Sequence, residues 1–198
     1  MSLKVECAAV LAGGKSSRMG REKALLRVEN EALIARVIAV LNPIFPQICV
    51  ITAEEVVALA ANREAVSDHF PNRGPLGGIQ AALDQFQAPT FIVACDMPHL
   101  CGAFIEFLSQ NLEGEALVPC GESGAEPLHA VYTPDCLPIF EDFLRAEAKV
   151  PSMRRVLSSI DAHFVPVETA REFDPTLRCF SNWNTPEDLI QAPERAET

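Results

Sequence analysis

The sequence has no long apolar run, no cysteine pair in a C-x-x-C spacing and fewer basic than acidic residues. Nowhere in its 198 residues is there the stretch of roughly 20 apolar residues that a transmembrane helix needs, which excludes such a helix. Residues 1–4 lead directly into the first apolar run and lack the hydrophobic region of a signal peptide. These absences predict a cytoplasmic protein without a membrane partner.

The seven cysteines are scattered and odd in number, so the sequence predicts reduced thiols rather than a zinc site or a disulfide framework. Lys and Arg number 16 against 27 Asp and Glu, and the formal net charge is −11. Bulk electrostatics of this sign oppose binding to nucleic acid. The basic residues nevertheless gather in one short segment, at Lys15, Arg18, Arg21, Lys23 and Arg27. An acidic protein with one local basic segment suits a small anionic ligand.

Apolar runs and helical spacings alternate along the chain, which predicts a single domain over residues 1–198. We expect strands at residues 7–11, 47–52, 65–67, 90–94, 116–118, 128–132 and 164–167. We expect helices at residues 31–41, 54–62, 74–86, 102–112, 133–148, 152–160 and 185–190, and a frayed tail at 193–198. This alternation predicts a Rossmann-like α/β fold, a three-layer sandwich in which helices cover both faces of a mainly parallel sheet.

Residues 11–23 read L-A-G-G-K-S-S-R-M-G-R-E-K and follow the first predicted strand. Glycines let the backbone turn sharply and let a ligand lie against bare peptide N–H groups. The segment is not a P-loop, because that motif needs a glycine where Ala9 stands, and it lacks the G-x-G-x-x-G of dinucleotide sites. A strand, a glycine turn and a group of cations predict a phosphate site. The alternative is a surface turn with solvated charges.

Asp96 follows the predicted strand 90–94 in the segment Cys95–Pro98, which reads C-D-M-P. Ligands of open α/β sheets sit at the carboxyl ends of the strands, so we expect Asp96 to project into that crevice. Mg²⁺ usually takes only one or two protein carboxylates and keeps its remaining ligands as water or phosphate. Asp96 is therefore the predicted Mg²⁺ ligand. The alternative is that it caps the helix that follows Pro98.

The pattern L-A-G-G-x-S-x-R-M-G-x-x-K resembles the signature of nucleotidyltransferases that join an NTP to a phosphorylated acceptor and release pyrophosphate. Within that superfamily it is most similar to the molybdenum cofactor guanylyltransferases. Three later segments resemble the family's G-P-L-x-G, C-D-x-P and N-x-N-T-P-E elements, at 74–78, 95–98 and 182–187. The sequence departs from the family at Glu22, where aspartate is common, and at Gly77, where alanine is common.

The resemblance implies a nucleotide-diphospho-sugar transferase-like fold and a transfer of GMP from Mg·GTP to molybdopterin. It also implies that the product passes to recipient molybdoenzymes. Residues up to about 100 would bind the nucleotide and the remainder would bind the acceptor. Two alternatives stay open: a related transferase that uses CTP or another small phosphorylated acceptor, and a non-catalytic carrier of the cofactor.

The same resemblance supplies the expected site residues. The catalytic residues would be Lys23, Arg18 and Asp96, the two cations stabilising charge on the α-phosphate and on the leaving pyrophosphate. The nucleotide would be bound by Leu11, Ala12, Gly13, Gly14, Lys23, Thr52, Asp68, Gly74, Pro75, Leu76, Gly77 and Asp96. The acceptor would be bound by Asn182, Asn184 and His129.

Several of these assignments have competitors within the sequence. Ser67 and His69 compete with Asp68 for contact with the nucleoside. A lone histidine near an apolar strand is commonly a structural residue, which is the alternative for His129. Trp183 is expected in the core or in the wall of the site. Lys15 is expected, with Arg21, at its rim.

Overall fold

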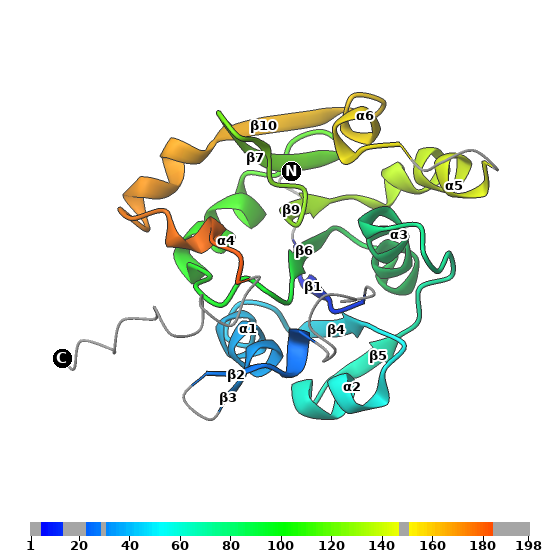
Figure 1. Cartoon of the computed structure of the whole chain (residues 1–198). Coiled ribbons are helices and arrows are strands. Elements are labelled where there is room, and N and C mark those ends of the chain that lie inside the picture. The colour runs from blue at the N-terminus through cyan, green and yellow to red at the C-terminus, as the bar shows by residue number, and fades with distance from the viewer. Residues whose placement is uncertain (1–4, 14–22, 29–30, 147–150, 184–198) are drawn as a thin grey trace.

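A mainly parallel β-sheet covered by helices on both faces forms the centre of the protein (Figure 1). The structure is a computed structural model that describes residues 5–13, 23–28, 31–146 and 151–183. The strand order is β10-β7-β9-β6-β1-β4-β5, and β8 pairs with the end of β7. The strands of this sheet are β1 (Cys7–Leu11), β4 (Gln47–Ile51), β5 (Glu64–Val66), β6 (Thr90–Ala94), β7 (Ala116–Gly121), β8 (Gly124–Ala125), β9 (His129–Tyr132) and β10 (Ala162–Pro166).

On the path from β10 to β5, β9 is antiparallel to both its neighbours and the other pairings are parallel. A separate two-stranded sheet is formed by β2 (Arg27–Val28) and β3 (Glu31–Ala32). The α-helices are α1 (Leu33–Leu41), α2 (Glu55–Ala61), α3 (Pro75–Phe86), α4 (Gly102–Gln110), α5 (Leu137–Arg145) and α6 (Met153–Leu157). The 3₁₀ helices are η1 (Lys23–Leu25), η2 (Pro134–Cys136), η3 (Val167–Glu172) and η4 (Arg178–Phe180).

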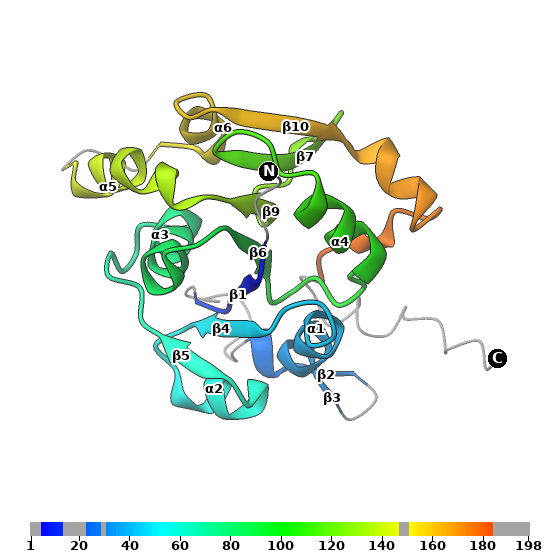
Figure 2. The same cartoon turned by 180° about the vertical axis from the view of Figure 1, so that it is seen from behind.

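Each face of the sheet has its own apolar core, because side chains alternate between the two faces of a strand. On one face, Ala8 and Val10 of β1 pack with α1, α2 and α4. On the other, Ala9 packs with α3, α5 and α6. Figures 1 and 2 show the same division, with α1 and α4 on one side of the sheet and α3 and α5 on the other.

The helices form where apolar residues recur at helical spacing. In α1 the buried residues are Leu33, Ile34, Val37, Ile38 and Leu41, which share one face of the helix. That face covers the sheet, and the helix ends at Leu41, with Asn42 as its C-cap just before a proline. Among the described residues, no helix is both long and apolar enough to cross a lipid bilayer.

The three-layer α/β architecture predicted from the sequence is confirmed, and each strand predicted from 7–11 to 164–167 is present. Two local predictions were wrong. The helix expected at 133–148 is divided into η2 and α5, and residues 31–32, expected at the start of a helix, form β3. The 3₁₀ helices of residues 167–180 were not predicted. The helix predicted at 185–190 and the tail at 193–198 lie outside the described residues.

Candidate active site

The predicted nucleotide-binding segments meet at the carboxyl edge of four adjacent strands. The ends of β5, β4, β1 and β6 are aligned by the pairs Ile51↔Val66, Leu11↔Ile51 and Leu11↔Ala94. Backbone hydrogen bonds continue this alignment beyond the strands, from Thr52 N to Val66 O (3.0 Å), from Ala12 N to Ile51 O (3.0 Å) and from Cys95 N to Leu11 O (3.1 Å). The residues that follow these strands therefore line one edge of the sheet.

Asp68 and Asp96 lie at opposite ends of this edge, because Asp68 follows β5 and Asp96 follows β6. Three interstrand steps separate the two strands, which corresponds to about 14 Å. The two strands thus place the aspartates at separate positions along the edge. The geometry fits a split of roles, with one at each end of an extended ligand.

The G-P-L-G-G segment begins α3 and depends on its glycines. Gly74 occupies the N-cap position with φ 69° and ψ −159°, a conformation that a residue with a side chain rarely adopts. Pro75 then takes the first helical position, where its missing N–H is no loss. The side chain of Leu76 is buried in the core beneath the helix, so what it offers a ligand is backbone.

Gly77 lies directly against the carboxylate of Asp68. A Cβ added at Gly77 would lie 2.6 Å from Oδ2 and 2.7 Å from Oδ1 of that carboxylate. The backbone N–H of Phe70 donates a hydrogen bond to Asp68 Oδ1 at 2.7 Å and holds the carboxylate in this position. His69 instead places its Nδ1 3.7 Å from Oδ2 of the exposed Asp84. Of these two competitors, Asp68 is the one that faces the glycine segment.

Thr52 is almost fully buried, and its hydroxyl accepts a hydrogen bond from Glu54 N at 3.0 Å. Ala12 is also buried, whereas Leu11 is half-buried and Gly13 is exposed at the end of the described segment. Gly78 lacks the Cβ that would collide with the Leu11 side chain, so α3 packs closely on the end of β1. The glycine segment is thereby brought next to Leu11, the last residue of β1.

Asp96 is half-buried in the turn after β6. Helix α4 begins only at Gly102 with Cys101 at its N-cap, so Asp96 does not cap it and the capping alternative is wrong. Trp183 N donates a hydrogen bond to Asp96 O at 2.9 Å. Trp183 is buried with Leu33, which confirms that it belongs to the core or the wall of the site. Asn182, the preceding residue, is exposed beside Asp96.

Several predicted residues cannot be placed within this geometry. Arg18, Gly14 and Asn184 lie outside the described residues, as do Lys15 and Arg21. The backbone of Lys23 begins η1. Their roles remain predictions.

His129 lies in the interior, and its position differs from the expected contact with an acceptor. It is fully buried, and its ring packs against Phe91, Phe104 and Phe180 at centroid distances of 5.2 to 5.8 Å. Burial lowers the pKa of His129 to about 4, against a smaller opposing effect of the Cys179 backbone. The neutral ring is therefore part of the aromatic core under the C-terminal segment, which favours the structural alternative.

A second group of side chains beside Asp96 was missed by the sequence analysis. Arg178 Nη2 lies 3.0 Å from Nε2 of His99 and 3.5 Å from its Nδ1. The His99 ring in turn meets the ring of Trp183 edge to face at 5.0 Å. His99 belongs to the C-D-M-P-H run, but 79 residues separate it from Arg178, and no local pattern connects them.

The loop that carries Arg178 is organised by Asp174. Its Oδ1 accepts hydrogen bonds from Thr176 N (3.1 Å) and Thr176 Oγ1 (2.7 Å), and its Oδ2 accepts one from Cys179 N (2.8 Å). Burial alone would raise the pKa of Asp174, but these hydrogen bonds together lower it. The ionised carboxylate fixes the turn between η3 and η4.

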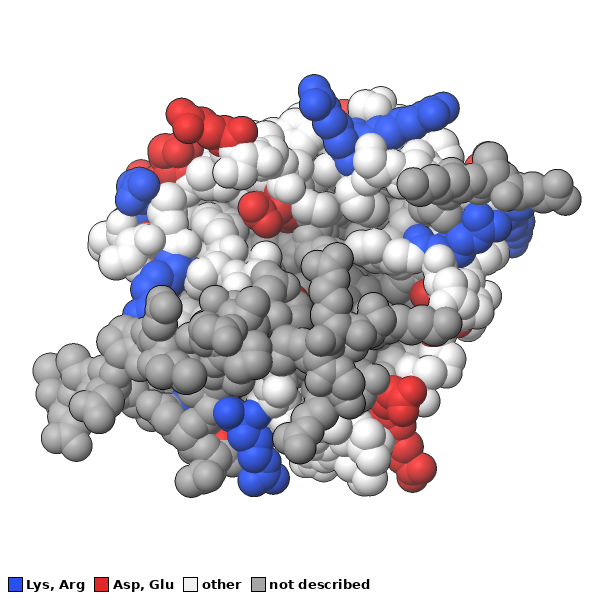
Figure 3. Space-filling model, viewed as in Figure 1, with Lys and Arg blue, Asp and Glu red and all other residues white. Residues whose placement is uncertain are grey.

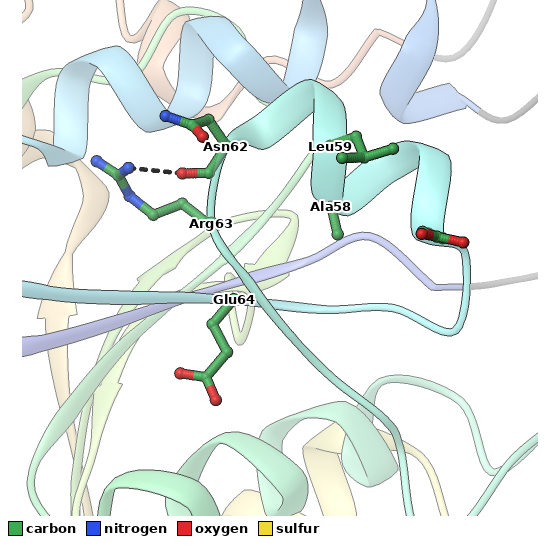
Figure 4. Close-up of a pocket in the computed structure, with 6 residues that line it drawn as sticks. Ala58, Leu59, Asn62, Arg63 and Glu64 are labelled. Carbon is green, nitrogen blue, oxygen red and sulfur yellow. Dashed lines mark hydrogen bonds between the residues drawn. The ribbon is translucent and has the colours of Figure 1, made fainter.

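Two surface hollows have different relations to the site. One is lined by Glu55, Ala58, Leu59, Asn62, Arg63 and Glu64 (Figure 4). Because Glu64 is the first residue of β5, this hollow lies at the amino edge of the sheet, away from the site. The other adjoins the glycine segment, with residues 72–76 on one side and residues 151–153 on the other.

The described charged side chains on the face of Figure 1 lie in separate groups, most of them near its periphery and one acidic group above its middle (Figure 3). Among the described residues, no group of three or more His, Cys, Asp or Glu is arranged to hold a metal ion. One carboxylate oxygen donor at Asp96 is the chemistry that Mg²⁺ accepts, since it completes its shell with water and phosphate oxygens. A zinc ion would require a set of nitrogen or sulfur ligands instead.

Comparisons with known proteins identify the family of the chain. The family model described as "MobA-like NTP transferase domain" matches residues 8–164. The chain is 37% identical to a probable molybdenum cofactor guanylyltransferase of Pelotomaculum thermopropionicum, over 95% of this chain and 92% of that protein. It is 35% identical to the molybdenum cofactor guanylyltransferase of Syntrophotalea carbinolica, over 94% and 90%.

Among solved structures, the fold is similar to molybdopterin-guanine dinucleotide biosynthesis protein A of Archaeoglobus fulgidus. The TM-score is 0.80 at 29% identity, covering 92% of this chain and 94% of that chain.

Proposed function

Because the chain belongs to the MobA-like NTP transferase family, we propose that it transfers GMP from GTP to molybdopterin and releases pyrophosphate. The observation that carries this proposal is the shared edge of β5, β4, β1 and β6, which aligns Asp68, the glycine segment and Asp96. The relatives described above, named as molybdenum cofactor guanylyltransferases, support the choice of substrates.

In the proposed reaction, the terminal phosphate oxygen of molybdopterin forms a bond to the α-phosphorus of GTP. The bond from that phosphorus to the oxygen bridging to the β-phosphate breaks, and pyrophosphate leaves with the electron pair. The attacking group is already an anion, so the protein needs no general base. Its contribution is to position both substrates and to stabilise the developing charge.

Each part of the edge then has a role. Asp68 accepts N–H groups of guanine or holds a ribose hydroxyl, next to the closely approaching backbone of Gly77. Lys23 and Arg18 bind the phosphates, for which guanidinium and ammonium groups are suited. Asn182 and Asn184 contact the acceptor. Residues up to about 100 thus serve the nucleotide and the later residues serve the acceptor.

The proposed metal is Mg²⁺, held by the carboxylate of Asp96. When bound, it would offset the negative charge of the triphosphate and of the leaving pyrophosphate. Asp96 is oriented by the turn after β6 and by the Trp183 N–H bond to its own carbonyl. We further propose that the product is passed to recipient molybdoenzymes.

The test combines nucleotide binding with turnover. Calorimetry with GTP, CTP, ATP and UTP, each with and without Mg²⁺, should show a Mg²⁺-dependent preference for GTP. The Asp96→Ala variant should lose most turnover with molybdopterin and keep its fold, whereas Asp84→Ala, an exposed aspartate of α3, should behave like the wild type. Near-normal activity of Asp96→Ala would contradict the metal assignment. A preference for CTP would change the product, and nucleotide binding without turnover would favour the carrier alternative.

A further inference from the structure

Arg178 is a half-buried cation without an ion pair to any described carboxylate. Its guanidinium lies against the ring of His99, at 3.0 Å from Nε2. Arginine only donates hydrogen bonds, so the ring nitrogen that faces it is an unprotonated acceptor. Burial first, and then the charges of Arg178 and Arg36, lower the pKa of His99, which is consistent with a neutral ring.

The acidic residue of the same loop is engaged elsewhere. The carboxylate of Asp174 accepts its three hydrogen bonds from Thr176 and Cys179. A cation that is partly removed from water without a carboxylate partner is costly. This arrangement leaves the guanidinium available for an external anion.

The contacts between Arg178 and Asp96 show at which end of the site Arg178 lies. Trp183 contacts both His99 and the Asp96 carbonyl, so Arg178, His99, Trp183 and Asp96 form a continuous chain of contacts. In Figures 1 and 2, residues 173–183 lie beside α4, on the opposite side of β6 and β1 from α3. The glycine segment and Asp68 lie on the α3 side.

We propose that Arg178, supported by His99, binds the phosphate group of the acceptor substrate beside Asp96. This inference rests on the proposed function, because the attacking group in that reaction is a phosphate of the acceptor. A guanidinium can bind two phosphate oxygens at once, which fixes the orientation of the group as well as its position. Asp174 and the aromatic core around His129 then act as positioning elements, since they hold the loop that presents Arg178.

Kinetics with both substrates provide the first test. In Arg178→Ala the KM for molybdopterin should rise about tenfold or more, as expected for the loss of a charge-assisted hydrogen bond, with the KM for GTP within about twofold. Arg178→Lys should recover part of the effect. Arg171→Ala is the matched control, because Arg171 is an exposed arginine of the same segment that bonds to Pro175 O. Thermal unfolding of all variants should match the wild type.

A second readout works without turnover, because Trp183 is the single tryptophan of the chain and contacts His99. Titration with molybdopterin and with its dephosphorylated form should change the Trp183 fluorescence at lower concentration for the phosphorylated form. Arg178→Ala should abolish this difference. Wild-type protein that shows the difference but no GMP transfer would separate failure of the proposed function from this inference.

Three results would overturn the inference. An unchanged acceptor KM in Arg178→Ala, together with unchanged Trp183 titrations, would remove any role of Arg178 in binding. Equal weakening for GTP, or for pyrophosphate, would move Arg178 to the nucleotide side. Equal binding of phosphorylated and dephosphorylated acceptor to the wild type would show that this phosphate is not recognised.

Discussion

The close approach of Gly77 to Asp68 leads to a prediction about a single methyl group. In Gly77→Ala the new Cβ would lie 2.6 Å from Asp68 Oδ2 if nothing moved. The Asp68 carboxylate must move away by about 0.5 Å or more, because non-bonded atoms repel each other steeply at such distances. That movement strains the 2.7 Å hydrogen bond from Phe70 N, which now holds the carboxylate in place.

The cost should appear in ligand binding rather than in stability. Alanine is favoured over glycine in a helix by up to about 1 kcal/mol, which offsets part of the strain. Hydrogen bonds to a charged acceptor contribute about 1.5–3 kcal/mol each, so misplacing Asp68 should raise the Kd for GTP by about tenfold or more. We expect Gly77→Ala to unfold near the wild-type temperature and to bind GTP more weakly.

The assay is calorimetric titration with Mg·GTP in a double-mutant cycle with Asp68→Ala. In the Asp68→Ala background, adding Gly77→Ala should change the Kd for GTP by less than about twofold, because the carboxylate that the new Cβ would displace is absent. Gly102→Ala is the matched control, because Gly102 lies in the first turn of α4 just as Gly77 lies in the first turn of α3. A Cβ at Gly102 would lie 3.4 Å from Ile44 Cδ1, which is far less crowded than the contact at Gly77. Wild-type affinity in Gly77→Ala, or an equal loss in the Asp68→Ala background, would refute the reasoning.

Two further predictions concern the support of the C-terminal segment. His129 stays neutral in the folded protein down to about pH 4, whereas in the unfolded protein it takes up a proton near its ordinary pKa. Between these two pH values the unfolded state binds more protons than the folded state, so the free energy of unfolding decreases as the pH falls. This shift corresponds to about 3 kcal/mol, so urea denaturation from pH 7 to pH 4 should show a weaker dependence of stability on pH for His129→Leu than for the wild type. An equally strong pH dependence in His129→Leu would contradict this account. Asp174→Ala removes the acceptor of three hydrogen bonds and should cost about 1–3 kcal/mol while raising the KM for the acceptor. Because the pKa of Asp174 is lowered in the folded protein, the ionised carboxylate stabilises the fold at neutral pH, and this stabilisation is lost as the pH falls through that pKa. The stability of Asp174→Asn should therefore depend less on pH than that of the wild type.

The nucleotide side of the site could be predicted from the sequence because each of its parts is local. Gly13, Asp68 and Asp96 each follow a strand within two residues, and parallel strands end at the same edge. A short apolar run followed by Gly13, Asp68 or Asp96 is therefore enough to place these residues together. What the sequence could not supply is the contact between Asp68 and Gly77, because it depends on how α3 packs against the end of β5.

The acceptor side could not be predicted in the same way, for two physical reasons. Residues 167–180 form 3₁₀ turns, and the Asp174 side chain stabilises the part between them. In such short turns apolar residues do not recur at a regular spacing, so the sequence gives no periodic signal from which to predict them. Their positions depend on tertiary contacts, such as Phe180 on His129. His129 itself resembled a site residue because the local sequence does not show that its side chain is buried, and it is this burial that keeps the ring neutral.

This difference has a consequence for how the two substrates are selected. The nucleotide side is tied to the sheet, since displacing Thr52 or Gly78 would disturb β4, α3 and the core beneath them. Arg178 is instead carried by a turn that the Asp174 carboxylate stabilises from within, and whose Phe180 packs against Phe104 of α4 and His129 of β9. Substitution of the half-buried Arg178 can therefore alter recognition of the acceptor at little cost to the fold, unlike substitution of Asp174 or of the buried Cys179 and Trp183. Acceptor preference should accordingly vary with this segment while the choice of nucleotide stays constant, and exchanging residues 174–181 for those of a relative would separate the two.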